Sequence, residues 1–286
     1  MKKKKNRILS VSGAALCLFF PILLAACSQE DALPRPLEVS AEVGSPATRA
    51  TDAHADDYDK SEFVAGDVIR ITDGTNTADY QRVVTGTTGT WQPASGQTAL
   101  TTTGNGSETF TASYPTAFTR ILTDQRTATN FWQSNQLTAK GVLDGNQATF
   151  SFAPEAAKVT LVVKYGNSDS DKKLPGTASL EGTGIATDAA STSETINAYG
   201  ASAAGTSALQ HTYVAIVKPG SRTFTIKVKA GDSGETEKSY TEKAAHTLKA
   251  GYNYQYNFTS TNELILNGIT VERFVETTET DAGNAT

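Results

Sequence analysis

Two short stretches near the N-terminus carry residues on which chemistry could take place. The first, Leu24-Ala25-Ala26-Cys27, has the pattern of a lipobox. A signal peptidase would cut before Cys27, and the new N-terminal cysteine would carry acyl chains. The second is Arg49 followed by Ala50, a lone arginine among small and polar residues, which is what an arginine-specific protease needs. The sequence therefore predicts lipidation at Cys27 and cleavage between Arg49 and Ala50.

The residues before the cysteine predict a targeting segment. A basic group at residues 2–7 precedes an almost wholly apolar stretch that runs to Ala26. Because this stretch is short for a membrane span and contains Pro21, we favour a lipoprotein signal peptide over residues 1–26. Two alternatives remain: the segment could be an uncleaved N-terminal anchor, and Arg49 could be an ordinary linker arginine.

Cysteine content and charge exclude several classes of function. Cys17 lies in the signal and Cys27 would be acylated, so the mature chain has no free thiol, disulfide or cysteine-based metal site. The signal contains five of the 25 Lys and Arg and none of the 30 Asp and Glu, which leaves 20 basic residues against 30 acidic ones. This negative balance disfavours binding to nucleic acid and suits an extracellular protein.

Patterns for catalysis, cofactors or metals are lacking. His54, His211 and His246 are too scattered for metal-ligand spacing. Asn167 to Asp171 resembles the start of a calcium loop, but Lys172 stands where glycine is required, so a polar turn is expected. We expect no enzyme, no cofactor and no metal, although carboxylate pairs formed on folding leave a glycosidase open. Three aromatic residues are expected in the core rather than on a sugar-binding surface: Trp91, Trp132 and Tyr114.

After Arg49 the sequence predicts an all-β protein. Thr, Ser, Gly and Ala dominate, apolar runs are short, and no helical period persists for three turns. Asp73-Gly74 between two alternating segments predicts a hairpin. Tyr252 to Phe258 alternate strictly and place four aromatic residues on one face. Residues 188–207, with few large side chains, are expected to form a loop.

The strand pattern also predicts two domains. Many short strands with frequent turn signals indicate β-sandwiches. Val159 to Tyr165 is the most apolar of these segments, which favours burial on both faces. Pro154 and its small neighbours suit a crossing between two sandwiches, so we place the boundary near Ala153. The expected parts are a propeptide with an N-terminal strand (27–49), an N-terminal β-sandwich (50–153) and a C-terminal β-sandwich (154–286).

Several motifs, in order, carry a resemblance to a known family. Besides the lipobox and Arg49, they are Glu62-Phe63-x-x-Gly66-Asp67-x-Ile69, Ser113-Tyr114-Pro115, Phe150-x-Phe152 before Ala157-Lys158-Val159, Tyr213-x-x-Ile216-Val217-x-Pro219 and Leu248-x-Ala250-Gly251-x-x-Tyr254-x-Tyr256-x-Phe258. Together they resemble the fimbrillin-family lipoproteins, which are subunits of type V pili of the major or minor fimbrium type. Pro154-Glu155 stands where such families often have a histidine.

This resemblance implies a structural subunit, stalk or tip, of a cell-surface pilus that serves adhesion. It implies two transthyretin-like sandwiches, export as an acylated outer-membrane lipoprotein, removal of the N-terminal strand and polymerisation by strand exchange. The implied partners are other pilus subunits, an arginine-specific protease and, before maturation, the outer membrane through the lipid. An anchor subunit would keep its N-terminal strand. The alternative is a surface glycan-binding lipoprotein that keeps its tether.

The two segments that would exchange can be examined from their side chains. Leu37, Val39, Ala41 and Val43 alternate with polar residues and form one apolar face. Removing this strand would leave an apolar groove and an open sheet edge, which is a template for another strand. The expected donor lies near the C-terminus, where Gly268 suggests a bulge; its residues are Leu264, Ile265, Leu266, Ile269, Val271 and Phe274. The same segment could equally be a permanent strand of the second sandwich.

Overall fold

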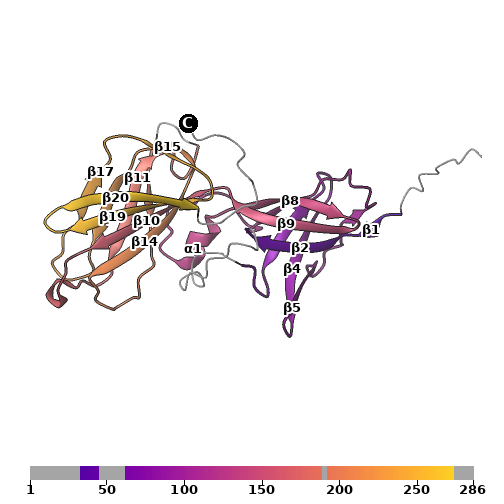
Figure 1. The fold of residues 1–286 in the computed structure, drawn as a ribbon, viewed down its shortest axis with the longest axis horizontal. Coiled ribbons are helices and arrows are strands. Elements are labelled where there is room, and N and C mark those ends of the chain that lie inside the picture. The colour runs from indigo at the N-terminus through magenta and orange to yellow at the C-terminus, as the bar shows by residue number, and fades with distance from the viewer. Residues whose placement is uncertain (1–32, 45–61, 189–191, 274–286) are drawn as a thin grey trace, which may run out of the picture. The chain divides into compact units, whose positions relative to one another are not determined.

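The computed structural model describes residues 33–44, 62–188 and 192–273 (Figure 1). Nearly all of the regular structure in these ranges is β-strand, and the α-helix α1 (Ala128–Gln133) and the 3-10 helix η2 (Asp169–Asp171) are short. The predicted all-β fold is therefore confirmed. None of the helices in the described ranges is long and apolar enough to span a membrane.

The N-terminal part of the described chain is built on a seven-stranded sheet, in the order β2-β9-β8-β7-β3-β4-β5. All neighbours are antiparallel except β2, which runs parallel to β9. The two end strands of this order, β2 and β5, also contact each other, so the sheet curls around its own core. The strands are β2 (Glu38–Val43), β3 (Val68–Thr72), β4 (Thr77–Thr85), β5 (Thr88–Pro93), β7 (Thr111–Tyr114), β8 (Leu137–Asp144) and β9 (Gln147–Pro154).

Aromatic side chains fill the inside of this curled sheet. The ring of Phe63 meets Trp91, Tyr114 and Phe152 edge to face, with ring centroids 5.2, 5.3 and 5.1 Å apart. Such edge contacts match the positive edge of one ring to the negative face of another. Phe150 and Phe152 are fully buried and lie on alternate positions of β9, as its period of two requires. We call this core the N-terminal cluster.

The hairpin predicted at Asp73-Gly74 is confirmed as β3 and β4. The carboxylate of Asp73 accepts hydrogen bonds from the backbone N–H of Asn76 at 2.6 Å and of Thr75 at 2.8 Å. These bonds, with that to the Asn76 backbone the strongest, lower the pKa of Asp73. Gly74 takes a positive φ of 92°, which glycine adopts without steric cost.

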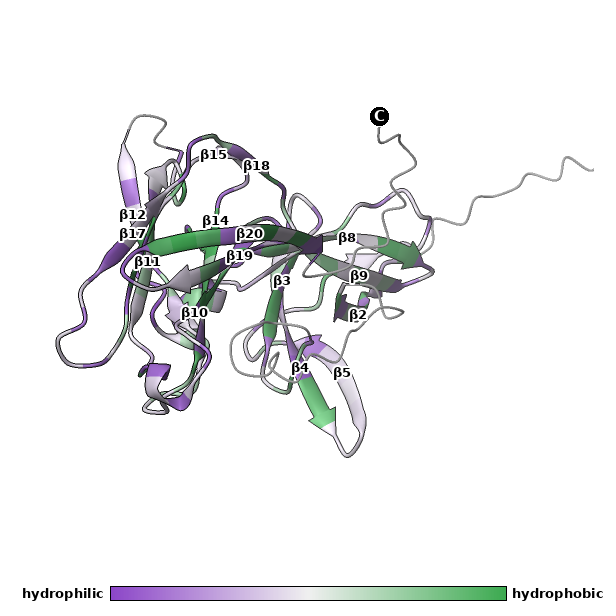
Figure 2. Cartoon of the chain, turned by 60° about the vertical axis from the view of Figure 1, so that its left-hand side comes forward, coloured by the Kyte–Doolittle hydropathy of each residue, from purple (hydrophilic) through white to green (hydrophobic). Residues whose placement is uncertain are grey.

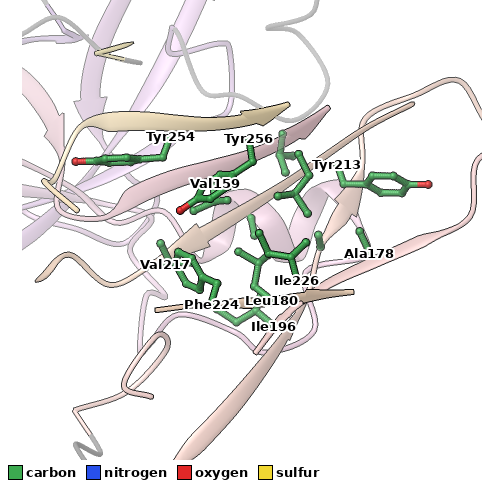
Figure 3. Packing of buried hydrophobic residues seen from close by; sticks show 14 of the residues in the cluster. Val159, Ala178, Leu180, Ile196, Tyr213, Val217, Phe224, Ile226, Tyr254 and Tyr256 are labelled. Carbon is green, nitrogen blue, oxygen red and sulfur yellow. The ribbon is translucent and has the colours of Figure 1, made fainter. Parts of the chain in front are cut away.

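The C-terminal part contains a five-stranded sheet, β13-β14-β10-β19-β20, and a four-stranded sheet, β12-β11-β16-β17. A second cluster of buried apolar residues, the C-terminal cluster, draws on both sheets (Figure 3). The strands are β10 (Ala157–Lys164), β11 (Thr177–Thr183), β12 (Ser193–Asn197), β13 (Tyr199–Gly200), β14 (Gln210–Val217), β16 (Thr225–Lys229), β17 (Lys238–Thr241), β19 (Tyr252–Ser260) and β20 (Leu264–Arg273). Two short strands, β15 (Gly220–Arg222) and β18 (His246–Leu248), pair with each other.

Two sequence patterns predict this second cluster correctly. Strand β10 buries both of its faces from Ala157 to Leu161, as its apolar composition requires. Strand β19 presents its aromatic face to the cluster, with Tyr254, Tyr256 and Phe258 buried and Tyr252 partly buried.

The expectation of a loop over residues 188–207 is wrong in part. Strand β12 pairs with β11, and β13 pairs with β14, so this segment contributes to both sheets. Ile196 is fully buried and Ala198 is 4% exposed. The small polar residues of segment 188–207 show no clear strand pattern, because pairing with neighbouring strands, rather than local composition, decides that they form strands.

A segment between β7 and β8 reaches into the C-terminal cluster and includes α1. The helix begins after Thr127, whose hydroxyl accepts the backbone N–H of Asn130 at 3.2 Å, and it buries Phe131 among the residues of this cluster. Gln125, fully buried, donates its side-chain amide to the carbonyl of Ile216 at 2.8 Å and accepts the Ile216 N–H at 2.7 Å. The side chain thus pairs with the backbone of β14 as a neighbouring strand would.

A second side chain, Glu108, holds the turn after the short strand β6 (Thr101–Thr102). Its carboxylate accepts hydrogen bonds from the hydroxyl of Thr102 and, at 2.9 Å each, from the N–H and hydroxyl of Thr103. Strand β6 pairs with β1 (Arg35–Pro36), so the turn supports the start of the N-terminal strand. The hydrogen bond from Thr102, the strongest cause, lowers the pKa of Glu108.

The two hydrogen bonds between the Gln125 side chain and the Ile216 backbone, which we call the Gln125 clamp, give the first prediction. Replacing Gln125 by Met keeps the length of the side chain but leaves the N–H and C=O of Ile216 unpaired, which should lower the free energy of unfolding by about 1–3 kcal/mol. Denaturant unfolding measures the change. The control is Gln92→Met on the exposed face of β5, where we expect less than about 0.5 kcal/mol. Equal effects in the two variants would contradict the clamp.

The carboxylate of Glu108 gives a pH-dependent prediction. Because its pKa is lower in the folded protein, its contribution to stability is complete above the ordinary value of 4.5 and is lost as the pH falls through the folded value. Glu108→Gln should therefore unfold more easily than the parent at pH 7, and this difference should narrow at pH values below about 4. Glu263→Gln, on an exposed loop, serves as the control in the same thermal unfolding series. A difference that stays constant with pH would refute the assignment.

Candidate functional site

Strand β2 lies at one end of the seven-stranded sheet, beside β9 (Figure 1). Six residues of β2 pair in register with six of β9, from Glu38 with Gln147 to Val43 with Phe152. The backbone N–H of Glu38 donates to the carbonyl of Asn146 at 2.9 Å, and that of Gly44 to Phe152 at 2.8 Å. The strand therefore completes the hydrogen bonding of the β9 edge.

All four apolar residues predicted on one face of this strand contact the N-terminal cluster. Leu37, directly before β2, and Val43, its last residue, are 4% and 3% exposed. Val39 and Ala41 are only partly buried but pack against the same cluster. Burial of each large apolar side chain contributes about 1.5–3 kcal/mol, so the strand is held mainly through its ends.

Polar side chains also hold β2, and no pattern in the sequence predicts their contacts. The side-chain amide of Asn146 donates to the carbonyl of Pro36 at 3.2 Å and to the carboxylate of Glu38 at 3.1 Å. The hydroxyl of Ser151 donates to Glu42 at 3.3 Å. The contact of Ser151 with Glu42 joins direct partners in the register of β2 and β9, and Asn146, just before β9, holds the start of β2.

Strand β20, the second predicted segment, lies at the edge of the five-stranded sheet and pairs along its length with β19. The register shifts beside Asn257 and Phe258, whose partners are Gly268 and Leu266. The bulge expected at Gly268 is therefore present. In this structure β20 is a strand of its own sheet.

The side chains of β20 are less buried than those at the ends of β2. Leu264 is 5% exposed, and Leu266 and Ile269 pack partly against the C-terminal cluster. Ile265 and Val271 are 48% and 51% exposed, so apolar area along this edge faces solvent. In Figure 2, β20 shows green, hydrophobic segments interrupted by purple, hydrophilic ones. The strand combines apolar character with incomplete burial.

The remaining predicted positions, Cys27, Arg49, Ala50 and Phe274, lie outside the described residues, as does His54. Lipidation and cleavage therefore stay predictions.

The other polar residues that stand out in the sequence take part in contacts that support the fold. His211 is buried, and its Nε2 lies 2.6 Å from the carbonyl oxygen of Lys173, while His246 lies beside Glu242. The carboxylate of Asp171 accepts the backbone N–H of Asn167 and of Ser168, which closes the expected polar turn. In the part of the chain that the structure describes, no three His, Cys, Asp or Glu residues gather as a metal site.

The three aromatic residues that could have formed a sugar-binding surface lie in or against the core, as expected. Trp91 and Tyr114 are 7% and 4% exposed, and Trp132 stacks on Tyr114 with ring centroids 6.0 Å apart. A hollow does occur over β3, β7, β8 and β9, but its lining is mainly Thr, Ser and Ala, and its one aromatic residue, Phe152, is buried. No ring in this hollow is available for stacking on a sugar.

Solved structures share this fold at low sequence identity. A proposed cell adhesion protein from Bacteroides uniformis is 18% identical, with a TM-score of 0.51, over 83% of this chain and 98% of the other. Another proposed cell adhesion protein, from Bacteroides ovatus, is 15% identical, with a TM-score of 0.56, over 85% of this chain and 98% of the other. The search of curated proteins gives no match. The model of the family described as fimbrillin-like matches residues 48–273, which is most of the sequence, and the chain therefore belongs to the fimbrillin-like family.

Proposed function

We propose that this chain is a structural subunit, stalk or tip, of a cell-surface pilus, and that it assembles by strand exchange and serves adhesion. Family membership supports the role of a pilus subunit at the cell surface. The observation that carries the assembly mechanism is the position of β2. It is an edge strand with its apolar face on the N-terminal cluster, and it ends at Val43, shortly before Arg49.

Cleavage after Arg49 would turn β2 into a separate peptide. The strand has no other covalent link to the sheet, so only its pairing with β9 and its packing would hold it. Its release would uncover Phe150 and Phe152 of the N-terminal cluster and the backbone groups of β9. An apolar groove beside an unpaired strand edge favours the addition of another strand.

The strand that fills this groove is, in our proposal, β20 of another subunit. It is an edge strand with a single neighbour along its length, and apart from Leu264 its apolar side chains are partly buried or exposed. Without the bulge, the period of two would place Ile265, Ile269 and Val271 on one face. That face would match the alternating apolar face of β2.

Export as a lipoprotein precedes these steps. Acylation at Cys27 would hold the precursor at the outer membrane, and an arginine-specific protease would then free the remainder of the chain. A glycan-binding lipoprotein that retains its tether is the second candidate, and it requires residues 27–49 to stay attached. The buried rings of Trp91 and Tyr114 weigh against that candidate. We infer no enzymatic activity.

The lipoprotein step predicts that Cys27→Ala abolishes lipidation and surface delivery. The motivation is the lipobox behind a basic segment. Cells that express the parent or the variant are labelled with a fatty-acid analogue, and the protein is recovered and its label measured. Cys17→Ala, within the signal, is the matched control and should label as the parent does. Equal labelling of the Cys27 variant and the parent would refute the lipobox.

Strand exchange predicts a difference between protein that starts at Ser28 and protein that starts at Ala50. The shorter form lacks β2 and should melt at a lower temperature, because its groove exposes apolar side chains. A peptide of residues 264–274 should raise the melting temperature of the shorter form, since a ligand that binds only the folded state stabilises it. The longer form, whose groove is filled, should change little.

Two controls make this test specific. A peptide with Asp at positions 265, 269 and 271 should not stabilise the shorter form, because charge on the inserted face opposes burial. Leu37→Asp with Val39→Asp in the longer form should lower its melting temperature and make it respond to the parent peptide. If truncation costs no stability and the peptide shifts neither curve, strand exchange at this site is wrong.

A further inference from the structure

The groove that β2 fills is deepest near its two ends. Leu37 and Val43 are 4% and 3% exposed, whereas Val39 and Ala41, between them, are only partly buried against the N-terminal cluster. Leu37 and Val43 are six positions apart, so both point to the same face of the extended chain. We call the places of these two side chains the deep positions. A strand that replaces β2 has to supply apolar side chains at both of them.

Strand β20 has two large apolar side chains at the same spacing. Ile265 and Val271 are six positions apart, and they are 48% and 51% exposed in their own sheet. There they point to opposite faces, because the bulge beside Gly268 adds one residue between them. Strand β9, in contrast, pairs with β2 over six residues without a bulge. A donor that pairs with β9 in this way is straight, and straightening β20 brings Ile265 and Val271 to one face.

We propose that β20 of a second copy of this chain inserts into the groove parallel to β9, with Ile265 and Val271 at the two deep positions. The proposal rests on the strand exchange argued above and adds its register and direction, which exchange alone leaves open. Ile265 lies at the start of β9, and Val271 lies beside Phe152, as Val43 does. Side chains that are about half exposed in the donor's own sheet thus fill the most deeply buried places of the groove.

The backbone contacts at the start of the groove fit this register. The N–H of Leu37 donates to the carbonyl of Leu100 at 2.7 Å, and the carbonyl of Pro36 accepts the side-chain amide of Asn146 at 3.2 Å. In the proposed register Ile265 supplies this N–H, and the residue before it supplies the carbonyl. Both contacts use backbone groups of the inserted strand, so they do not depend on the sequence of β2.

Neighbouring registers place polar side chains at the deep positions. A shift of two residues brings Glu263 there in one direction, and Asn267 with Arg273 in the other. A shift of one residue turns the other face inward and brings Thr270 or Glu272 to the second deep position. Burial of a charged or polar group without a partner opposes binding. These shifts are therefore disfavoured.

The middle of the groove separates the proposed register from a shift of four residues. In the proposed register Asn267 takes the place of Val39, which is only partly buried, and Ile269 takes the place of Ala41. A shift of four residues would instead bring the charged side chain of Arg273 to the place of Ala41. Because an uncharged amide at a partly buried position costs less than a charge against an apolar cluster, the proposed register is favoured.

Disulfide trapping tests the register, because the chain has no cysteine after Cys27. Protein that starts at Ala50 and carries Ser151→Cys is mixed, under mild oxidation, with peptides of residues 264–274 that have one cysteine at position 266, 268, 270 or 272. In the proposed register position 270 is the direct partner of Ser151, so the Thr270→Cys peptide should give the highest yield of disulfide. Direct partners lie about 4.8 Å apart, whereas Cα atoms more than about 7 Å apart cannot be bridged. A highest yield at any of the other three positions would overturn the register.

A second cysteine position on β9 tests the direction. With Thr149→Cys in place of Ser151→Cys, parallel insertion moves the best position in the peptide from 270 to 268, whereas antiparallel insertion moves it to 272. A move to 272 would overturn the parallel direction. The control for reactivity is the longer form with Glu42→Cys and Ser151→Cys, which are direct partners and should close a disulfide within the chain.

Peptide variants without cysteine test which face is inserted. Asn267→Val should raise the melting temperature of the shorter form more than the parent peptide does, because position 267 faces the N-terminal cluster in the proposed register. The matched control is Thr270→Val, on the outward face, which should stabilise no more than the parent. A larger gain from Thr270→Val than from Asn267→Val would show that the opposite face is inserted and would overturn the register.

Thermal unfolding of the same mixtures distinguishes a wrong register from a failure of strand exchange. A peptide that raises the melting temperature but cross-links best at another position overturns the register alone. Peptides that neither raise the melting temperature nor cross-link overturn strand exchange at this groove and the register with it. Where the shorter form does not fold without a strand, the peptides are added during refolding, and the yield of folded protein replaces the melting temperature as the readout.

Discussion

The N-terminal sheet depends on a strand beside β9. The N-terminal cluster is closed on that side by β2, which supplies Leu37 and Val43 to the core and pairs with the β9 backbone. Any strand with apolar residues at every second position could supply both contributions, the apolar side chains and the backbone hydrogen bonds. The sheet is therefore stabilised by any suitable strand at this edge. Only a few side-chain contacts select β2 itself, such as those of Asn146 with Pro36 and Glu38. A fold with this property is suited to exchange.

Polar side chains would limit where the proposed exchange can occur. An exposed strand edge invites pairing with any other chain, so a protein that polymerises in a defined way must cover its other edges. Gln125 does this on β14, where its amide occupies both backbone groups of Ile216. Glu242 has a related role between the sheets: buried at 6% exposure, it accepts hydrogen bonds from the hydroxyl of Tyr256 and the N–H of Phe224, each at 2.7 Å. Burial, and secondarily the bond to Glu242, raises the pKa of Tyr256 and keeps it a donor.

The sequence predicts the parts of this fold whose pattern is local. The turn at Asp73, the aromatic alternation of β19 and the apolar run of β10 each follow from short-range periodicity. The sequence pattern does not predict strands β12 and β13, because small polar residues form strands only when a neighbouring strand pairs with them. The contacts of Gln125 and Glu108 could not be predicted, since they join residues whose proximity is decided by the fold. At the edge of the N-terminal sheet, the alternation of β2 is predicted from the sequence, whereas the partial burial of Val39 and Ala41 is not.

The two ends of the chain differ in what their loss would expose. Strand β2 seals its cluster with two almost fully buried side chains, whereas β20 leaves Ile265 and Val271 about half exposed in its own sheet. Removing β20 would thus uncover less apolar area per residue than removing β2. The second sheet can also retain its remaining order, because β19 stays paired with β10. In the proposed exchange, the free-energy balance would therefore favour the transfer of β20 from its own sheet, where it buries less apolar area, to the groove beside β9 of another copy.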